Sequence, residues 1–326
     1  ACALFVFVVF MMRRTRKSMR CGSAAWSDVD KRRDFLLLVM ERVMANSPLV
    51  EVKNLSVNFP VSGGIMGRKV AEVKAVDDIS FSIGKSEIVG LVGESGCGKT
   101  TVGRAMINIL KYIVPDVEVG GEILYHFDGE DVDFNMLHSR RMGKYRSRVQ
   151  MIFQDPYASL NPRMTVSQIV EEPLKIHTEL KGPQRREKVI TLLEKVGLRE
   201  DQAGRFPHEF SGGQRQRVGI ARALAPSPDL IICDEPVSAL DVSIQAQVIN
   251  LMVDLQKEFD VSFLFIAHDL SVVEHISDKI AVMYLGNLVE FGESKQVYHH
   301  PRHPYSKALL SAVPVPDPKK KNRQRI

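Results

Sequence analysis

Cysteine is scarce in this chain, and long hydrophobic runs are missing. Four cysteines occur among 326 residues and none forms a CxxC pair, which excludes a disulfide framework and a cysteine-bound zinc site. The apolar run at residues 3–12 is too short to span a bilayer, and its basic residues follow it, whereas a secretory signal places them first. No other stretch is apolar enough to cross a membrane. With 44% apolar and 25% charged residues, the composition is that of a soluble globular protein from a reducing compartment.

Acidic residues are absent from the last residues of the chain, and the positive charge lies at the two ends. The net charge is +5, but residues 1–34 hold eight Lys/Arg against three Asp/Glu, and the tail from Lys319 holds five Lys/Arg and no acid. A basic end can bind nucleic acid or anionic lipid, but the simpler interpretation is a solvated, disordered segment. We expect residues 1–44 to be an N-terminal extension that is disordered or not native, such as an over-extended reading frame. A short amphipathic membrane anchor is the alternative.

Hydrophobic patterning predicts an α/β architecture without an internal repeat. Residues 61–68 are typical of a glycine-rich loop, and residues 87–92 form an apolar run that indicates a buried strand. After residue 211 helix and strand patterns alternate, which favours a parallel sheet covered by helices. The predicted strands are 49–59, 70–76, 79–83, 87–92, 230–233 and 262–267. The predicted helices are 100 to about 110, 212–224 and 244–259, with a further helical region at 165–200.

A phosphate-binding loop is predicted at residues 93–100. They read GESGCGKT, fit the pattern GxxxxGK[ST], and stand between a predicted strand and a predicted helix, as the motif requires. Glycines let backbone N–H groups turn toward phosphate oxygens, and a helix N-terminus adds partial positive charge. Lys99 can reach the β- and γ-phosphates, and the Thr100 hydroxyl can ligate Mg²⁺. The predicted nucleotide contacts are Gly93, Ser95, Gly96, Cys97, Gly98, Lys99, Thr100 and Thr101; Cys97 occupies a variable position of the motif and receives no redox role.

Polar residues follow two further apolar strands. Asp234 and Glu235 come directly after the run 230–233, where Asp234 can hold Mg²⁺ and Glu235 can polarise the attacking water. An acidic pair after a strand can also be a helix cap, but its place downstream of a phosphate loop favours catalysis. His268 follows the predicted strand 262–267. A lone histidine is more often structural, but ligands bind beyond the carboxyl ends of parallel strands, so we expect His268 to reach a γ-phosphate or its attacking water.

Residues 210–217 read FSGGQRQR and resemble the signature of the ABC ATPase family. Ser211 is a favourable helix N-cap, and the two glycines leave the helix N-terminus bare for an anionic phosphate. Because the chain already has its own phosphate loop, a second phosphate site implies a partner. The resemblance implies a head-to-tail dimer in which Ser211, Gly212, Gly213 and Gln214 close over the ATP of the other cassette, so that an isolated monomer is inactive.

The other elements of the family occur in the expected order. Gln154 resembles the glutamine that senses Mg²⁺ and the transmembrane subunit, and residues 238–241 resemble the loop that crosses the dimer interface, with Asp241 at the nucleotide. Phe59 resembles the aromatic residue that stacks on adenine, although an aromatic at a strand end is also commonly core. The resemblance implies ATP and Mg²⁺ as cofactors, with catalytic residues Glu235, His268 and Gln154 and metal ligands Thr100, Gln154 and Asp234.

The resemblance covers residues 49 to about 316 and implies a fold. That fold is an α/β P-loop NTPase (RecA-like) core with an antiparallel β subdomain and an inserted α-helical subdomain. We expect the ABC ATPase domain at residues 45–298, with the helical subdomain at about 160–225. Residues 299–326 would form a C-terminal extension and basic tail.

Two stretches, 155–163 (DPYASLNPR) and 303–310 (HPYSKALL) with the following VPVPD, resemble the oligopeptide/dipeptide importer subfamily. The resemblance implies a motor subunit at the cytoplasmic face of the membrane. Its partners would be a second cassette, either a paralogue or a copy, integral-membrane permease subunits and, indirectly, a substrate-binding protein; no nucleic acid is expected. Some subunits of the subfamily hold an iron–sulfur cluster through cysteines in this extension, but no cysteine follows Cys233, so we predict no cluster.

Three alternatives compete with this interpretation. Relatives of the subfamily also move nickel or glutathione, and the sequence does not name the cargo. A soluble, non-transport ABC ATPase is disfavoured because the chain has one cassette and neither a coiled-coil nor a zinc insertion. A plain P-loop kinase or GTPase is disfavoured by the signature at residues 210–217.

Overall fold

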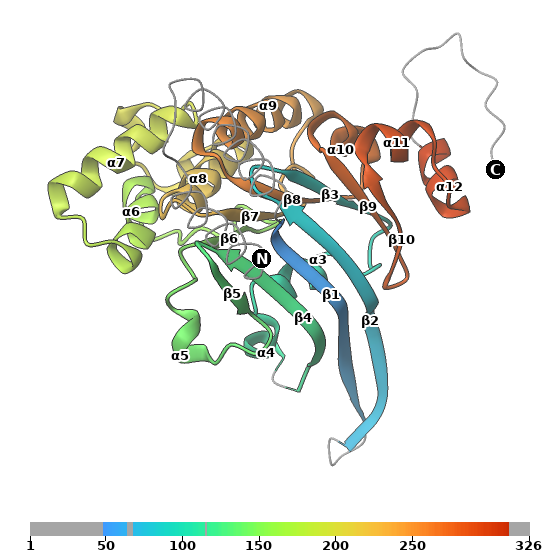
Figure 1. Ribbon diagram of the computed structural model, residues 1–326. Coiled ribbons are helices and arrows are strands. Elements are labelled where there is room, and N and C mark those ends of the chain that lie inside the picture. Colours follow the sequence, from blue (N-terminus) through green and yellow to red (C-terminus); the bar gives the residue numbers. More distant parts are fainter. Residues whose placement is uncertain (1–47, 64–67, 115, 313–326) are drawn as a thin grey trace, which may run out of the picture. The chain divides into compact units, whose positions relative to one another are not determined.

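The computed structural model describes residues 48–63, 68–114 and 116–312, and the unit that begins at Pro48 is treated by itself. The predictions for residues 1–44 and for the basic tail lie outside the described residues. Within the described ranges, no helix is long and apolar enough to span a membrane. Two sheets and the helices around them make up this unit (Figure 1).

The first sheet is antiparallel, with the strand order β2-β1-β4-β5. Its strands are β1 (Pro48–Gly63), β2 (Arg68–Gly84), β4 (Glu118–Phe127) and β5 (Glu130–Asp133). The two strands predicted at 70–76 and 79–83 are one strand, because the chain continues through a bulge at Asp78 (φ 53°), whose Oδ1 accepts a 2.7 Å hydrogen bond from Asn54 Nδ2. The loop predicted at 61–68 was too long, since β1 runs to Gly63 and β2 begins at Arg68.

The second sheet has the order β10-β9-β3-β8-β7-β6, and all its neighbouring strands are parallel except β9 and β10. Its strands are β3 (Ile88–Val92), β6 (Val149–Ile152), β7 (Leu230–Asp234), β8 (Ser262–Ala267), β9 (Lys279–Tyr284) and β10 (Asn287–Glu293). Every residue of β3, β7 and β8 is buried, which confirms the strands predicted from apolar runs. Both faces of these central strands are therefore covered.

The helices are α3 (Lys99–Met106), α4 (Leu110–Ile113), α5 (Ser139–Met142), α6 (Val166–His177), α7 (Gly182–Lys195), α8 (Gly212–Leu224), α9 (Val242–Phe259), α10 (Leu270–Ile276), α11 (Ser294–His299) and α12 (Pro304–Ala312). The helix predicted over 100–110 is wrong at its end: Asn108 adopts φ 50°, and its Nδ2 donates to Phe134 O at 2.6 Å. The hydrogen bond from Asn108 to Phe134 O stabilises the non-helical backbone between α3 and α4.

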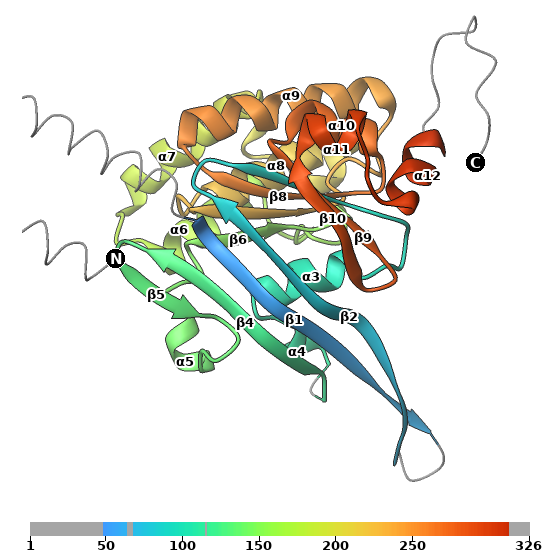
Figure 2. The ribbon, with the colours of Figure 1, turned by 45° about the vertical axis from the view of Figure 1, so that its right-hand side comes forward.

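Two hydrophobic cores lie on the two faces of the parallel sheet. Along β7, Ile231 and Cys233 belong to the core formed with α6 to α10, whereas Leu230 and Ile232 belong to the core formed with α3 and the antiparallel sheet. Helix α3 thus lies between the two sheets (Figure 2). Each fully buried Leu or Ile contributes about 1.5–3 kcal/mol of transfer free energy, so this layering places the start of α3 rigidly at one edge of the sheet.

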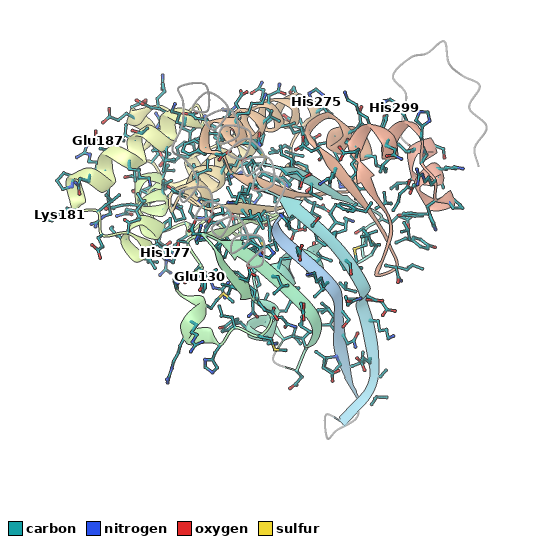
Figure 3. The ribbon with its side chains drawn as sticks, in the orientation of Figure 1. Glu130, His177, Lys181, Glu187, His275 and His299 are labelled. Atoms are coloured by element: carbon teal, nitrogen blue, oxygen red, sulfur yellow. The ribbon has the colours of Figure 1, made fainter. Side chains whose placement is uncertain are left out.

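Helices α6 and α7 lie beyond the β6 edge of the parallel sheet (Figures 1 and 2). Val189, Leu192 and Leu193 of α7 are buried in the core, while Glu187 is exposed and points outward (Figure 3). The helical region predicted at 165–200 thus consists of two amphipathic helices.

Arg148 ties the two sheets together. It precedes β6 and donates from Nε and Nη2 to the two carboxylate oxygens of Asp229 at 2.6 and 2.9 Å, and from Nη1 to Asp128 at 2.6 Å. Its guanidinium also lies 4.3 Å from the centre of the Phe127 ring. These contacts lower the pKa of Asp128, chiefly through the hydrogen bond from Arg148.

Candidate active site

The phosphate loop leaves β3 through a turn that excludes side chains at two positions. Gly93 adopts φ 153°, and a Cβ placed on it would lie 2.1 Å from Met283 O. Gly98 adopts φ 107°, and a Cβ there would lie 2.2 Å from Ala75 O of β2. Both sites combine a positive φ with contact to a neighbouring backbone, so only glycine fits them without strain. The glycines of the motif therefore seat the loop between β9 and β2.

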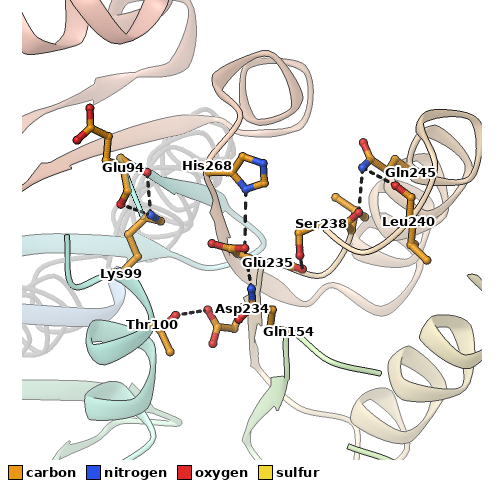
Figure 4. A network of polar contacts seen from close by, with 12 residues as sticks. Glu94, Lys99, Thr100, Gln154, Asp234, Glu235, Ser238, Leu240, Gln245 and His268 are labelled. Atoms are coloured by element: carbon orange, nitrogen blue, oxygen red, sulfur yellow. Dashed lines mark hydrogen bonds and ion pairs between the residues drawn. The ribbon is translucent and has the colours of Figure 1, made fainter. Parts of the chain in front are cut away.

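Lys99 lies under this loop and is 4% exposed. Its Nζ donates to Gly93 O at 2.7 Å and to Glu94 O at 2.8 Å (Figure 4). The third N–H of the ammonium group faces Cys97 Sγ at 3.9 Å, a weak acceptor that a phosphate oxygen can replace. Cys97 is buried beside Lys99. Burial raises the pKa of the Cys97 thiol and outweighs the positive charge of Lys99, which lowers it, so the thiol is neutral and unreactive.

Thr100 and Asp234 meet across the sheet although they are 134 residues apart in sequence. Thr100 Oγ1 donates to Asp234 Oδ1 at 2.7 Å, and Asp234 is 1% exposed. Burial raises the pKa of Asp234 above its usual value, while the Thr100 hydrogen bond and the positive charge of Arg104 oppose that shift. The half-buried Thr100 hydroxyl and the buried, poorly compensated Asp234 carboxylate are the hard oxygen donors that Mg²⁺ prefers, so this pair fits the ion.

Glu235 forms the centre of a second cluster at the ends of β6, β7 and β8 (Figure 4). Its Oε2 accepts a 3.0 Å hydrogen bond from Gln154 Nε2 and lies 3.8 Å from His268 Nδ1. The residue adopts φ 47°, and its N–H donates to Ile266 O at 3.0 Å, which turns the side chain away from the strand. An adjoining pocket of about 80 Å³, lined in part by Glu235 and His268, has room for a water.

The signature begins α8 as predicted. Ser211 is its N-cap: Ser211 Oγ accepts from Gln214 N at 3.4 Å, and Gln214 Oε1 accepts from Ser211 N at 3.1 Å. A Cβ on Gly213 would lie 2.5 Å from Ile244 Cγ2, so glycine allows α8 to approach α9 closely. Among the described residues, no hydrogen bond joins residues 211–214 to the phosphate loop. The signature is thus a separate part of the surface.

The loop 238–241 connects the catalytic cluster to α9. Asp241 is the N-cap residue of α9, but its exposed carboxylate makes no capping hydrogen bond. Gln245 holds the loop by donating to Val237 O at 3.0 Å and to Leu240 O at 2.8 Å (Figure 4). No sequence pattern indicates this role for Gln245, because both acceptors are backbone carbonyls, which any residue supplies.

Phe59 lies on β1 and pairs with Val73 of β2. Two residues beyond Val73 on the same strand, Ala75 lies against Gly98 of the phosphate loop. The half-buried Phe59 side chain also packs against the core between the two sheets. Both the adenine role and the core role fit this position, and the adenine contact stays a prediction.

Comparison with known proteins identifies the family. Residues 76–238 match the family model described as "ABC transporter", and residues 289–326 match "Oligopeptide/dipeptide transporter, C-terminal region". The chain belongs to the ABC transporter family. The cassette is 54% identical to the "Oligopeptide transport ATP-binding protein AppF" of Bacillus subtilis, over 82% of this chain and 78% of that protein. It is 55% identical to the "Oligopeptide transport ATP-binding protein OppF" of the same organism, over 85% and 86% of the two chains.

Other relatives of the cassette differ in length or are more distant. The "Glutathione import ATP-binding protein GsiA" of Escherichia coli is 48% identical over 87% of this chain, which spans 44% of that protein. Among solved structures, the dimeric cassette MJ0796 bound to ADP and Pi matches with a TM-score of 0.63 and 27% identity, over 75% of this chain and 98% of that one. The predicted family, fold class and ATPase activity of this cassette are confirmed.

Proposed function

We propose that this ABC ATPase binds and hydrolyses Mg²⁺-ATP in a head-to-tail pair of cassettes and thereby powers a peptide-class importer. The observation that carries the proposal is the convergence of six polar side chains beyond the carboxyl edge of the parallel sheet (Figure 4). The last residue of β7 and the chain segments that follow β3, β6, β7 and β8 supply them: Lys99, Thr100, Gln154, Asp234, Glu235 and His268.

Each of these groups has a separate part in hydrolysis. Lys99, whose third N–H faces only the weakly accepting thiol of Cys97, binds the β- and γ-phosphates. The Glu235 carboxylate accepts the proton of the water that attacks the γ-phosphorus, while the bond to the β-phosphate oxygen breaks. His268, 3.8 Å from Glu235, helps to orient the water and the γ-phosphate. Thr100, Asp234 and Gln154 would hold Mg²⁺, which would neutralise phosphate charge.

The paired arrangement follows from the second anion site. Beside the Ser211–Gln214 cap, the glycine N–H groups in the first turn of α8 favour a phosphate, yet no hydrogen bond among the described residues joins them to the phosphate loop of the same chain. A second cassette would supply the nucleotide that this helix closes over, and the free carboxylate of Asp241 would cross the same interface. The similar cassette MJ0796 is dimeric, which supports the pairing.

Coupling to a permease would use the region after β6. Phe153 and Tyr157 are exposed large side chains that flank Gln154, and α6 and α7 lie beyond the same sheet edge. A transmembrane partner docked there would contact the glutamine that bonds Glu235. The cassette would then be a peripheral subunit at the cytoplasmic face of the membrane, and a substrate-binding protein would act on the outer side of the permease. In this scheme the cassette spans about residues 45–298, its helical subdomain about 160–225, and the extension 299–326.

Peptides are the cargo that the relatives favour, and glutathione is the second candidate because of the 48% identity to GsiA. The test deletes the chromosomal gene, restores it either as wild type or as Glu235→Gln, and follows uptake of labelled oligopeptides, glutathione and nickel. The proposal is supported if the wild-type strain takes up peptides and the Glu235→Gln strain does not. Co-purification with membrane subunits is a second requirement; a stable ribosome or DNA complex without permeases contradicts the transport function.

A further inference from the structure

The C-terminal extension is joined to the core by a defined hydrogen-bonded turn before α12. Glu290 of β10 accepts hydrogen bonds from Arg302 N at 2.9 Å and from His303 N at 3.2 Å. His303 Nδ1 in turn accepts from Tyr305 N at 3.1 Å, which satisfies an N–H group of the first turn of α12. Leu309 packs against the hydrophobic core from the same helix. These contacts fix the direction in which the Tyr305 side chain leaves α12.

The Tyr305 side chain reaches the phosphate loop. Its ring lies 4.3 Å from the ring of Tyr284 at the end of β9, with a tilt of 38°. Its hydroxyl oxygen accepts a 3.0 Å hydrogen bond from the backbone N–H of Glu94. The two bonded residues are 211 positions apart in sequence, and the contact joins the segment 289–326 to the segment 76–238, which match different family models.

The same peptide segment is bonded on its other side by the phosphate-binding lysine. Glu94 O accepts from Lys99 Nζ at 2.8 Å and from Cys97 N at 3.3 Å. Glu94 therefore links the two side chains: its N–H donates to the Tyr305 hydroxyl, and its carbonyl accepts from Lys99 Nζ. Burial raises the pKa of Tyr305, so the phenol is neutral and able to accept this bond through its oxygen at neutral pH.

We propose that Tyr305 is a positioning residue of the phosphate loop, through which the docking of α12 sets the affinity of the cassette for ATP. The proposal rests on the ATP site proposed above. Without the hydroxyl, Glu94 loses one of its restraints, and the loop with Lys99 samples arrangements that do not bind phosphate. Binding ATP then has to order the loop, which weakens affinity without altering Glu235 or its water.

The experiment compares Tyr305→Phe with Tyr284→Phe in the purified full chain. Both changes remove one phenolic hydroxyl from the same pair of tilted rings, but of the two hydroxyls only that of Tyr305 forms a hydrogen bond within the described residues. We expect Tyr305→Phe to raise the Kd for ATP about three- to tenfold, the effect of losing one ordinary hydrogen bond, and Tyr284→Phe to leave it unchanged. Amide exchange at Glu94 should accelerate in the first variant alone.

A second variant reaches the same contact from the other end. Glu290→Ala removes the acceptor for Arg302 N and His303 N, so it should weaken ATP binding as Tyr305→Phe does. The double variant should be no weaker than the more affected single variant, because both act through one contact. In turnover assays the KM for ATP should rise while kcat changes less than about twofold. Simple loss of folded protein would instead lower the apparent kcat and leave KM unchanged.

The outcomes separate this inference from the proposed function. If the wild-type chain binds no ATP, the proposed function fails and this inference fails with it. If the wild type binds ATP and Tyr305→Phe binds it equally well, with unchanged exchange at Glu94, Tyr305 is a tether for α12 only and the inference is overturned. A fall in kcat at unchanged KM also overturns it.

Discussion

The replacement Glu235→Gln tests the assignment of the general base. Glutamine has the shape of glutamate, and its amide oxygen can still accept the 3.0 Å hydrogen bond from Gln154 Nε2. The bond from the residue 235 N–H to Ile266 O involves backbone atoms only and is retained. The change therefore removes the negative charge and the proton acceptor while leaving the loop in place.

The size of the effect follows from what surrounds Glu235. Gln154 has no group that takes up a proton, and His268 Nδ1 lies 3.8 Å from Oε2 on an exposed ring, so neither replaces the carboxylate at its position. A positioned general base contributes typically about 10²–10⁴-fold, and we expect kcat to fall by about this factor. The affinity for ATP should change less than about threefold, because Lys99 and the phosphate loop are untouched.

The assay measures phosphate release and, separately, equilibrium binding of ATP by the wild type and the variant. Glu187→Gln is the matched control, since it removes one negative charge from an exposed side chain on α7, outside the phosphate loop and the catalytic cluster. Wild-type affinity with turnover reduced at least about 100-fold, and accumulation of an ATP-bound dimer, agree with the base role. Turnover within about threefold of the wild type would remove Glu235 from that role.

Three further predictions concern the loop, the sheet junction and the metal site. In Gly98→Ala the new Cβ would lie 2.2 Å from Ala75 O, so ATP binding should weaken at least about tenfold. The control is Gly129→Ala, where φ is also positive but the space around the new Cβ is open; it should destabilise the chain less than Gly98→Ala. Arg148→Ala should lower the free energy of unfolding by about 2 kcal/mol in urea titrations, and equal stability would contradict its role at the junction. Asp234→Asn should abolish Mg²⁺-dependent hydrolysis yet stabilise the nucleotide-free chain at neutral pH. The buried carboxyl has a raised pKa in the folded state, so its contribution to stability falls as pH rises from about 3.8 through that raised pKa; calorimetry across this range checks the sign.

Local sequence patterns predicted the central elements well. The runs at β3, β7 and β8 are apolar throughout because these strands are buried on both faces, and Ser211 starts α8 because its hydroxyl caps the helix. Errors arose where side chains bond to distant groups. Asn108 ends α3 by donating to Phe134 O, and the Asn54–Asp78 bond carries β2 through a bulge. Neither partner lies within the window that a local pattern covers.

The sequence by itself determined which chemical groups are present and how the phosphate loop and the signature helix form, because glycine turns and helix caps depend on neighbouring residues. The tertiary structure decided which groups meet. Thr100 bonds Asp234 across 134 positions, Gln154 bonds Glu235 across 81, and Tyr305 bonds Glu94 across 211. These pairings require the strand order of the parallel sheet and the docking of α12, which result from burying the whole core and are not contained in any single segment.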